Sequence, residues 1–468
     1  MSTTTSRTDA ASSPNETGKP GLTASLAALA SELTLRDLPA EACERARLAI
    51  ADCIGSALAG VSDEAARIAR AAIGREGGAS RVWGTSLSAS PRDAALANGT
   101  AAHALAIDDT NESMKGHPSA PIVPALLALG EAVDAGGEAL LAAYVAGVEV
   151  AARLGRAVNP RHAEVGWHTT MTLGTVGAAA GAGKLLRLDA GSMRHAIGIA
   201  TSMAGGSRAN FGTMTKALGP GLAAQGGILA ATLASRGFTA NPDALESREG
   251  FIDLFCGAGQ AHPARGLQRG APFEIERPSV VFKLYPNCSL IHTTIDMVLD
   301  GVAAGEIDPG AVEGVTVSIS PRLDRMRVKG QPATVLQAKF SVEYAVACAL
   351  LRRSVGLSEF TDEVFQDEAI AAMMARVAVR IGDGFGEDNG DLAGILVEHK
   401  GRPRWSRALA KPRGHWTNPL PNGVLERKFL AGASGVLGDE QAATTWTALN
   451  GLEKLDCRVL VGLLVPPA

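Results

Sequence analysis

Four segments of the chain carry polar and titratable side chains inside surroundings that are otherwise apolar and rich in glycine. They are residues 103–110 with 116–119, 166–170, 210–216, and 283–288 with His292 beyond them. Imidazole titrates near neutral pH, so each histidine in such a setting is a candidate base or acid. Clustered titratable groups of this kind indicate a site of proton transfer if the fold brings them together.

Each of these residues also has an ordinary structural interpretation. A single buried histidine is more often a hydrogen-bonded core residue than a catalyst. Asp108 and Asp109 could cap the start of a helix, and Lys216 could be exposed to solvent. Tyr344 follows the apolar periodicity of a helix, which is typical of a core residue. The combination of the segments, and not any one residue, favours a functional site.

Other motifs that could hold a metal or a cofactor fail on spacing. Cys288 and His292 are four residues apart and could share one helix face, but no further ligand lies near them in the sequence. Residues 177–184 lack the glycine and lysine pattern of a phosphate-binding loop, and no dinucleotide fingerprint is present. We therefore expect a protein that binds no metal and needs no cofactor.

The elements that must position these residues are mainly helices. Apolar residues recur at helical spacing over residues 39–60, 123–133, 140–154, 170–186 and 219–234. The pattern changes near residue 270, where 315–319 and 376–381 alternate as strands, and 395–398 pairs with the residues around Trp405 through a turn at 401–403. Residues 341–352 and 368–374 read as helices between these strands, and helical character returns over 425–429 and 444–455.

We predict a mostly α-helical domain that is interrupted by an α+β lid domain, with the site between them. The boundaries are residues 1–20 for a disordered tail, 21–269 for the first part of the helical domain, 270–410 for the lid, and 411–468 for the helical return. The tail is rich in Ser, Thr and Gly and carries almost no large apolar residues.

Composition excludes several classes of partner. The net charge of −4 over 468 residues gives no basic face for nucleic acid or for an anionic membrane. No apolar run reaches the length of a membrane span, and no secretory signal precedes the helices. The six cysteines are scattered, which favours free thiols. We expect a cytoplasmic protein.

Several stretches together resemble the MmgE/PrpD family, which includes 2-methylcitrate dehydratase, cis-aconitate decarboxylase and iminodisuccinate epimerase. The matching stretches are residues 51–55, 98–103, 108–119, 166–173, 212–221, 285–296 and 338–344. The resemblance implies a helical domain with an α+β lid, a homodimer, and a small polycarboxylate as substrate. It also implies chemistry at a carbon next to a carboxylate, where a base takes a proton and cations meet the charge that develops.

The resemblance assigns residues to this pocket. The catalytic candidates are Thr110, His117, His168, Lys216 and Tyr344. The substrate-binding candidates are Asp109, Arg208, Lys216, Lys283 and His292. In this scheme His168 or His117 is the base, the two lysines hold carboxylates, and the tyrosine passes a proton to the leaving group.

The chain departs from the pattern of many family members at Ala106, Thr169, Gly219 and Cys288, where an acid, a proline and two histidines are frequent. Fewer acid and base candidates remain, which argues against copying the 2-methylcitrate or the decarboxylase assignment directly. We predict a lyase, with dehydration as its reaction. The alternatives are an epimerase of a dicarboxylate, a decarboxylase similar to cis-aconitate decarboxylase, and, least favoured, an inactive binding protein.

Overall fold

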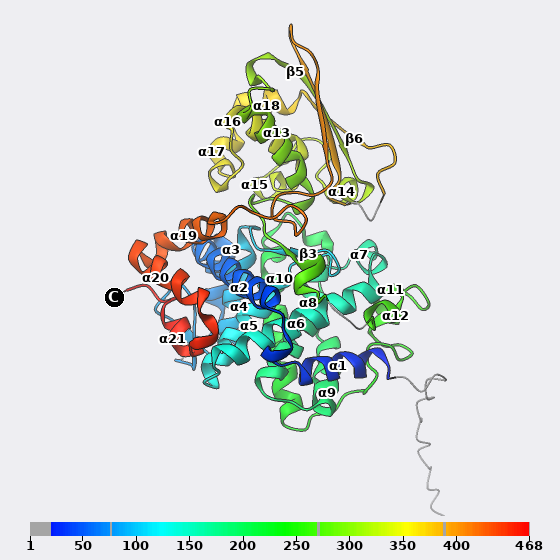
Figure 1. Ribbon diagram of the computed structural model, residues 1–468, viewed down its shortest axis with the longest axis vertical. Coiled ribbons are helices and arrows are strands. Elements are labelled where there is room, and N and C mark those ends of the chain that lie inside the picture. Colours follow the sequence, from blue (N-terminus) through cyan, green and yellow to red (C-terminus); the bar gives the residue numbers. More distant parts are fainter. Residues whose placement is uncertain (1–19, 75–76, 269–271, 387–389, 468) are drawn as a thin grey trace, which may run out of the picture.

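The computed structural model describes residues 20–74, 77–268, 272–386 and 390–467. The predicted disordered tail falls almost wholly on residues 1–19, and the predicted boundary at residue 270 falls on 269–271, so both lie outside the described residues. The chain forms a large helical body with a smaller α+β body above it (Figure 1). The fold class predicted from the sequence is confirmed.

The helical body is built from helices that pack around one hydrophobic core. They are α1 (Leu22–Glu32), α2 (Ala40–Gly60), α3 (Glu64–Ala72), α4 (Pro91–Ala104), α5 (Ser119–Ala132), α6 (Gly137–Val158), α7 (Arg161–Val165), α8 (Thr169–Leu185), α9 (Ala190–Thr201), α10 (Met214–Ser235), α11 (Phe251–Cys256) and α12 (Pro263–Gly266). Two short ribbons join parts of this body: β1 (Ser80–Arg81) with β2 (Ser88–Ala89), and β3 (Thr110–Asn111) with β4 (Val280–Val281).

Helix α10 is the centre of this body, and small residues let it approach its neighbours closely. It packs against α4 and α8. A Cβ atom at Gly99 of α4 would lie 2.8 Å from the Cα of Gly221, so neither position accepts a larger residue without a shift of the helices. Among the described helices, α10 alone is long and apolar enough to cross a membrane, but most of its apolar stretch is buried, as in the core helix of a soluble protein.

The α+β body has its own hydrophobic core and a four-stranded sheet of order β6-β5-β7-β8. Its strands are β5 (Val312–Ile319), β6 (Val377–Ile381), β7 (Ala393–His399) and β8 (Trp405–Leu409). β5 pairs in parallel with β6, and the other pairs are antiparallel. The strands and the hairpin predicted from the alternating patterns are confirmed.

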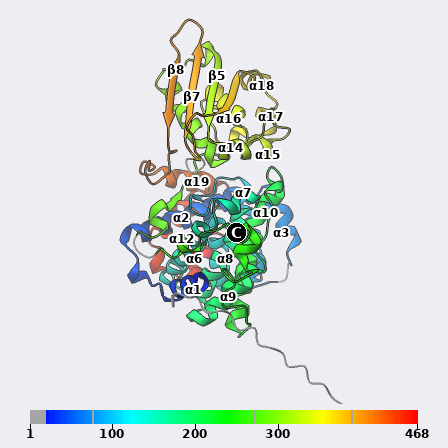
Figure 2. The same ribbon diagram turned by 90° about the vertical axis from the view of Figure 1, so that its right-hand side faces the viewer.

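Helices cover one side of this sheet (Figure 2). They are α13 (His292–Ala303), α14 (Pro321–Met326), α15 (Val335–Ala338), α16 (Val342–Arg352), α17 (Asp362–Phe365) and α18 (Glu368–Met374). Side chains on β5 alternate between buried and partly exposed, which is the pattern of a sheet with one covered face.

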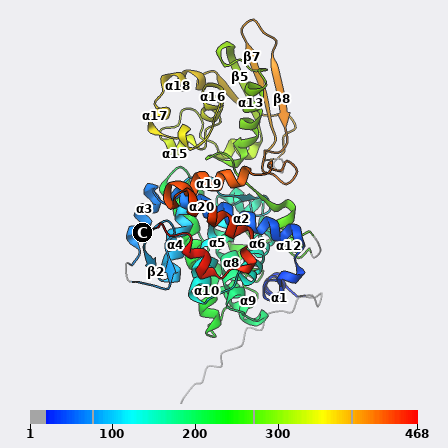
Figure 3. The same ribbon diagram turned by 60° about the vertical axis from the view of Figure 1, so that its left-hand side comes forward.

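The chain then returns to the helical body through α19 (Val424–Leu437), α20 (Asp439–Asn450) and α21 (Cys457–Gly462), which lie over α2 and α5 (Figure 3). The segment that leaves the helical body at Phe282 and the segment that returns to it at Gly414 lie side by side. The amide of Phe282 donates to the carbonyl of Gly414, at 3.2 Å. A Cβ at Gly414, where φ is +93°, would lie 2.1 Å from the Phe282 carbonyl oxygen, so this crossing requires glycine. We call this pair of segments the neck.

Candidate active site

A pocket of about 110 Å³ lies where the two bodies meet. This is several times the roughly 10–15 Å³ that one water needs, so the pocket can hold a small molecule. The helical body supplies loops that follow α4, α7 and η2 (Arg208–Asn210), together with the first turn of α10. Val281 of β4 also lines the pocket, and the α+β body supplies Lys283, residues 287–290, Arg322, Arg325, Met326, Lys339, Phe340 and Asp391.

Local structure fixes the histidines of the helical body. His103 is in the last turn of α4, and His117 lies just before α5. His168 is the residue that precedes α8, and its amide donates to the carbonyl of Gly206 at 2.9 Å. The amide of Arg208 donates to the carbonyl of Gly166, also at 2.9 Å. These two hydrogen bonds fix the loop before α8 against the loop that contains Arg208, beside the pocket.

The short β3–β4 ribbon brings Lys283 to the helical body. Pairing of Thr110 with Val281 places the lysine, two residues further on, over the loop that follows α4. The side chain of Lys283 is almost fully buried, and its Nζ donates to the carbonyl of Ala106. Ala106 has φ +59°, a left-handed conformation that turns the loop. Thr110 and Ala106 both line the pocket.

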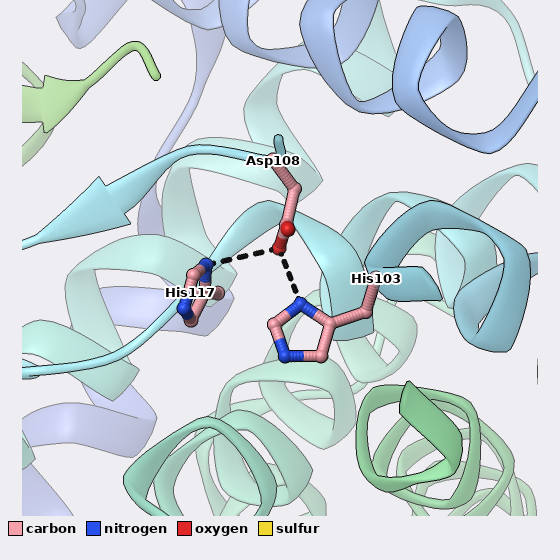
Figure 4. Close-up of side chains that lie close together, drawn as sticks. All are labelled: His103, Asp108 and His117. Atoms are coloured by element: carbon pink, nitrogen blue, oxygen red, sulfur yellow. Dashed lines mark hydrogen bonds and ion pairs between the residues drawn. The ribbon is translucent and has the colours of Figure 1, made fainter. Parts of the chain in front are cut away.

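Three side chains form a hydrogen-bonded cluster at the wall of the pocket (Figure 4). Oδ2 of Asp108 lies 2.8 Å from Nδ1 of His103 and 3.0 Å from Nδ1 of His117. The first contact is an aligned hydrogen bond. The second is an ion-pair contact whose ring orientation is not that of an aligned hydrogen bond. Nε2 of His103 lies 2.6 Å from Nζ of Lys216, so the cluster continues into α10.

Burial sets the protonation of the histidines. It lowers the pKa of His103 to about 3 and that of His117 below its usual value, although Asp108 opposes both changes. Burial also lowers the pKa of His168 well below its usual range, and the nearby His103 and Lys216 add to this. All three rings are therefore neutral at pH 7 and can accept a proton. For Asp108, burial alone would raise the pKa, but the two imidazoles outweigh it and hold the pKa well below the usual range.

Positive charge surrounds these neutral rings. Burial lowers the pKa of Lys216 to about 8 and that of Lys283 to about 7, while Asp108 works against both shifts. Lys216 is therefore still mostly protonated at neutral pH. Its Nζ also lies 5.7 Å from the centre of the Phe211 ring, which contacts the edge of His168.

Arginines from both bodies meet at the same pocket. Arg208 comes from the helical body, and Arg322 and Arg325 come from α14. Burial lowers the pKa of Arg208, and Arg325 and Arg322 lower it further, so the guanidinium groups are close enough to repel. An anion with several carboxylates would relieve this repulsion. Arg322, Arg325 and Lys339 were not among the residues predicted from the sequence.

Three predicted site residues lie outside the pocket. Tyr344 is fully buried in the core of the α+β body, where its hydroxyl donates to the carbonyl of Glu359 at 2.5 Å. It packs there against Phe360, so its assignment to the pocket is corrected: its single proton is already donated within the core. His292 is buried at the start of α13 against the ring of Tyr285 and does not line the pocket.

Asp109 is the third of these residues. Its carboxylate accepts the Ser119 hydroxyl at 2.5 Å and the Ser119 amide at 3.3 Å, at the start of α5. Burial raises the pKa of Asp109 well above its usual value. Asp109 therefore holds the loop against α5, and its predicted contact with substrate is corrected. The other predicted residues line the pocket: Thr110, His117, His168, Arg208, Lys216 and Lys283.

The positions that depart from the family pattern also gather here. Ala106, Thr169 and Cys288 line the pocket. Gly219 lies in α10 directly under His168, and a Cβ there would be 3.1 Å from Nδ1 of that ring. The missing side chains therefore leave space next to the imidazole and remove titratable groups from the wall.

His103, Asp108 and His117 are also a donor set that a metal could use. The geometry argues against this use. The carboxylate oxygen is already engaged at hydrogen-bond distances, and the ammonium group of Lys216 lies 2.6 Å from His103. A divalent cation would meet this positive charge, so we interpret the three residues as a hydrogen-bonded cluster.

Two family models match most of the chain. Residues 24–264 match the MmgE/PrpD N-terminal domain, and residues 285–454 match the MmgE/PrpD C-terminal domain. The chain is 29% identical to a cis-aconitate decarboxylase from Homo sapiens, over 91% of this chain and 90% of that protein. It is 26% identical to a cis-aconitate decarboxylase from Aspergillus terreus, over 97% and 98% of the two chains. A cis-aconitate decarboxylase from Mus musculus is 28% identical, over 83% and 82%.

Proposed function

Because this chain belongs to the MmgE/PrpD family, we propose that it is a cofactor-independent lyase that removes a proton next to a carboxylate of a small polycarboxylic acid. One observation carries the proposal. The neutral imidazole of His117, backed by the carboxylate of Asp108, faces a pocket whose other walls carry the cationic groups of Lys216, Lys283 and Arg208. A base beside fixed positive charge is what this chemistry requires.

Dehydration is the reaction we favour. Nε2 of His117 takes the proton from the carbon next to a carboxylate, and Lys283 with the arginines holds the negative charge that moves onto that carboxylate. The electron pair then forms the carbon–carbon double bond as the carbon–oxygen bond of the hydroxyl breaks. Lys216 donates a proton to the leaving hydroxyl, which departs as water. The pKa of Lys216, about 8, suits a group that must be protonated at neutral pH and still give up its proton.

Decarboxylation is the second candidate, and the relatives favour it, since those named above are cis-aconitate decarboxylases. In that reaction carbon dioxide leaves and a carbon gains a proton, which Lys216 would donate. The absence of an acid at Ala106 and of imidazoles at Gly219 and Cys288 weighs against the same reaction in this chain.

Proton NMR of the purified enzyme in heavy water tests the proposal. The panel is citrate, 2-methylcitrate, malate, cis-aconitate and iminodisuccinate. Deuterium incorporation with loss of water supports dehydration, loss of carbon dioxide supports decarboxylation, and exchange at unchanged mass supports epimerisation. His117→Gln should abolish exchange, while His262→Gln, which changes an exposed histidine outside the pocket, should not. Full exchange by a folded His117→Gln variant would refute the role of His117.

A further inference from the structure

We propose that His103 is a positioning residue that couples the acid Lys216 to the base His117 through the carboxylate of Asp108. The inference rests on the proposed function for the two roles at its ends, but the coupling itself concerns residues that can be observed without substrate. The side chain of His103 has no exposed surface, and the residue is not among those that line the pocket, so it acts through its neighbours.

The geometry gives each polar atom of His103 one role. Nδ1 lies 2.8 Å from Oδ2 of Asp108, an oxygen that can only accept while the carboxylate is charged, so the proton of the neutral ring is on Nδ1. Nε2 then carries a lone pair, and Nζ of Lys216 donates to it at 2.6 Å. The carboxylate of Asp108 therefore polarises the imidazole, which makes Nε2 a stronger acceptor for the ammonium group of Lys216.

Asp108 is shared between the two ends. Its Oδ2 also lies 3.0 Å from Nδ1 of His117, in the ion-pair contact described above. When Nε2 of His117 takes a proton from the substrate, the imidazolium group engages the carboxylate more strongly. The pull of Asp108 on His103 weakens, and Nε2 of His103 becomes a poorer acceptor. The ammonium group of Lys216 loses stabilisation and becomes a stronger acid at the moment the leaving group needs a proton.

The proton balance of the step is complete. One proton moves from the carbon of the substrate to His117, and one moves from Lys216 to the leaving hydroxyl, which becomes water. His117 then returns its proton to solvent, and Lys216 regains one. The pKa shifts agree with a carboxylate that serves both ends: Asp108 raises the pKa of both Lys216 and His117 against the effect of burial.

Other titratable groups also act on Lys216 and His117. Those that act on the two ends from neighbouring elements are Lys283, Cys288, Lys339 and His168. None of these is hydrogen-bonded to His103. A change at His103 therefore separates the coupling from the general positive field of the pocket.

A double-mutant cycle on the full chain tests the coupling without a substrate. The pKa of Lys216 is measured by NMR of protein labelled with [15N]lysine, with Lys216→Met to assign the signal. Asp108→Asn should lower this pKa by about one unit, a tenfold change in proton affinity. In the His103→Asn background, whose shorter amide keeps a donor toward residue 108 but ends short of the position of Nε2 that accepts from Lys216, we expect less than half of that change. An equal change in both backgrounds would overturn the proposal.

The pH dependence of turnover provides a second readout once a substrate is known. His103→Asn should move the alkaline limb of the kcat profile, which reports Lys216, and leave the acidic limb in place. His103→Gln keeps an acceptor for Lys216 but loses the donor to Asp108, so it should move the acidic limb. If both variants lowered kcat equally and moved neither limb, His103 would be structural only. If no acid in the panel reacted while the cycle still showed coupling, the proposed function would fail and the coupling would stand.

Discussion

Substitution of Lys283 by methionine should stabilise the folded protein while it abolishes activity. The lysine is 1% exposed, and burial lowers its pKa from 10.5 to about 7. The difference of 3.5 units (10.5 − 7) corresponds to roughly 5 kcal/mol of burial cost when the side chain is charged, at about 1.4 kcal/mol per unit. Methionine keeps an unbranched stem without the charge. It loses the bond to the Ala106 carbonyl, which is worth about 1.5–3 kcal/mol, so we expect a net gain of about 2–3.5 kcal/mol at pH 6.

The gain in stability of Lys283→Met must fall as pH rises. Because the folded-state pKa of Lys283 lies below the unfolded-state value, the unfolded chain binds more protons between pH 7 and 10.5. The parent protein therefore becomes more stable relative to the variant as pH rises through this window, by about 1.4 kcal/mol per unit. Below pH 7 both states are protonated and the margin is constant. By pH 9 the advantage of Lys283→Met should have disappeared.

Urea denaturation of parent and variant at pH 6, 7, 8 and 9 measures this margin. Lys329→Met is the matched control, since that side chain is 66% exposed and its removal should change the free energy of unfolding little. A Lys283→Met variant that is less stable than the parent at pH 6, or whose margin is the same at pH 6 and pH 9, would refute the depressed pKa of the buried lysine.

Three further substitutions probe the packing and charge of the site. Lys428→Met leaves the buried carboxylate of Asp52 without its partner at 2.6 Å and should cost about 3–5 kcal/mol in urea denaturation; adding Asp52→Asn should restore most of it, and failure to do so would contradict the pairing. Gly219→Ala places a methyl group 3.1 Å from Nδ1 of His168, so turnover should fall at least tenfold while the thermal midpoint holds; unchanged kcat would exclude a role for that ring. Arg322→Gln should raise KM for the polycarboxylate about tenfold, equivalent to about 1.4 kcal/mol, with kcat little changed; an unaltered KM would show that this guanidinium group does not bind substrate.

Local patterns in the sequence were sufficient for the fold class. The alternation over β5 and the turn after β7 are properties of neighbouring residues, and the structure has both. The same holds for α2, whose apolar periodicity ends at Gly60 as predicted. The tight crossing of α4 and α10 agrees with a composition rich in small residues, but no local pattern identifies which glycines meet.

The pocket depends on contacts between distant segments, and here the sequence was less informative. His117, His168 and Lys216 stand in compact polar motifs, and the structure brings them together. Arg322 stands in a short helix with Asp324 and Arg325, a charge pattern typical of an exposed helix, and only the position of α14 over the helical body brings it to the pocket. The prediction that Tyr344 lines the pocket was wrong for the opposite reason. Its motif is distinctive, but its helix turns the ring into the core of the α+β body.

His103 shows why a role can escape even when the residue is seen. It belongs to the first polar segment, yet nothing in the sequence indicates that Lys216, 113 residues away, donates to its Nε2. Its function arises from a buried hydrogen-bond network, and such networks are defined by distances and not by spacing along the chain.

The neck has a consequence for how the two bodies can be separated. Because Phe282 and Gly414 are hydrogen-bonded neighbours, the inserted segment begins and ends at one point, and none of the described residues outside the segment belongs to its core. A short linker across this point would close the helical body without the insert, and the insert could be produced as a protein of its own. Lys283 is the first residue beyond the junction, so such a cut would separate Lys283, Arg322 and Arg325 from the imidazoles of the helical body. The two bodies have separate cores, but the pocket needs residues from both of them.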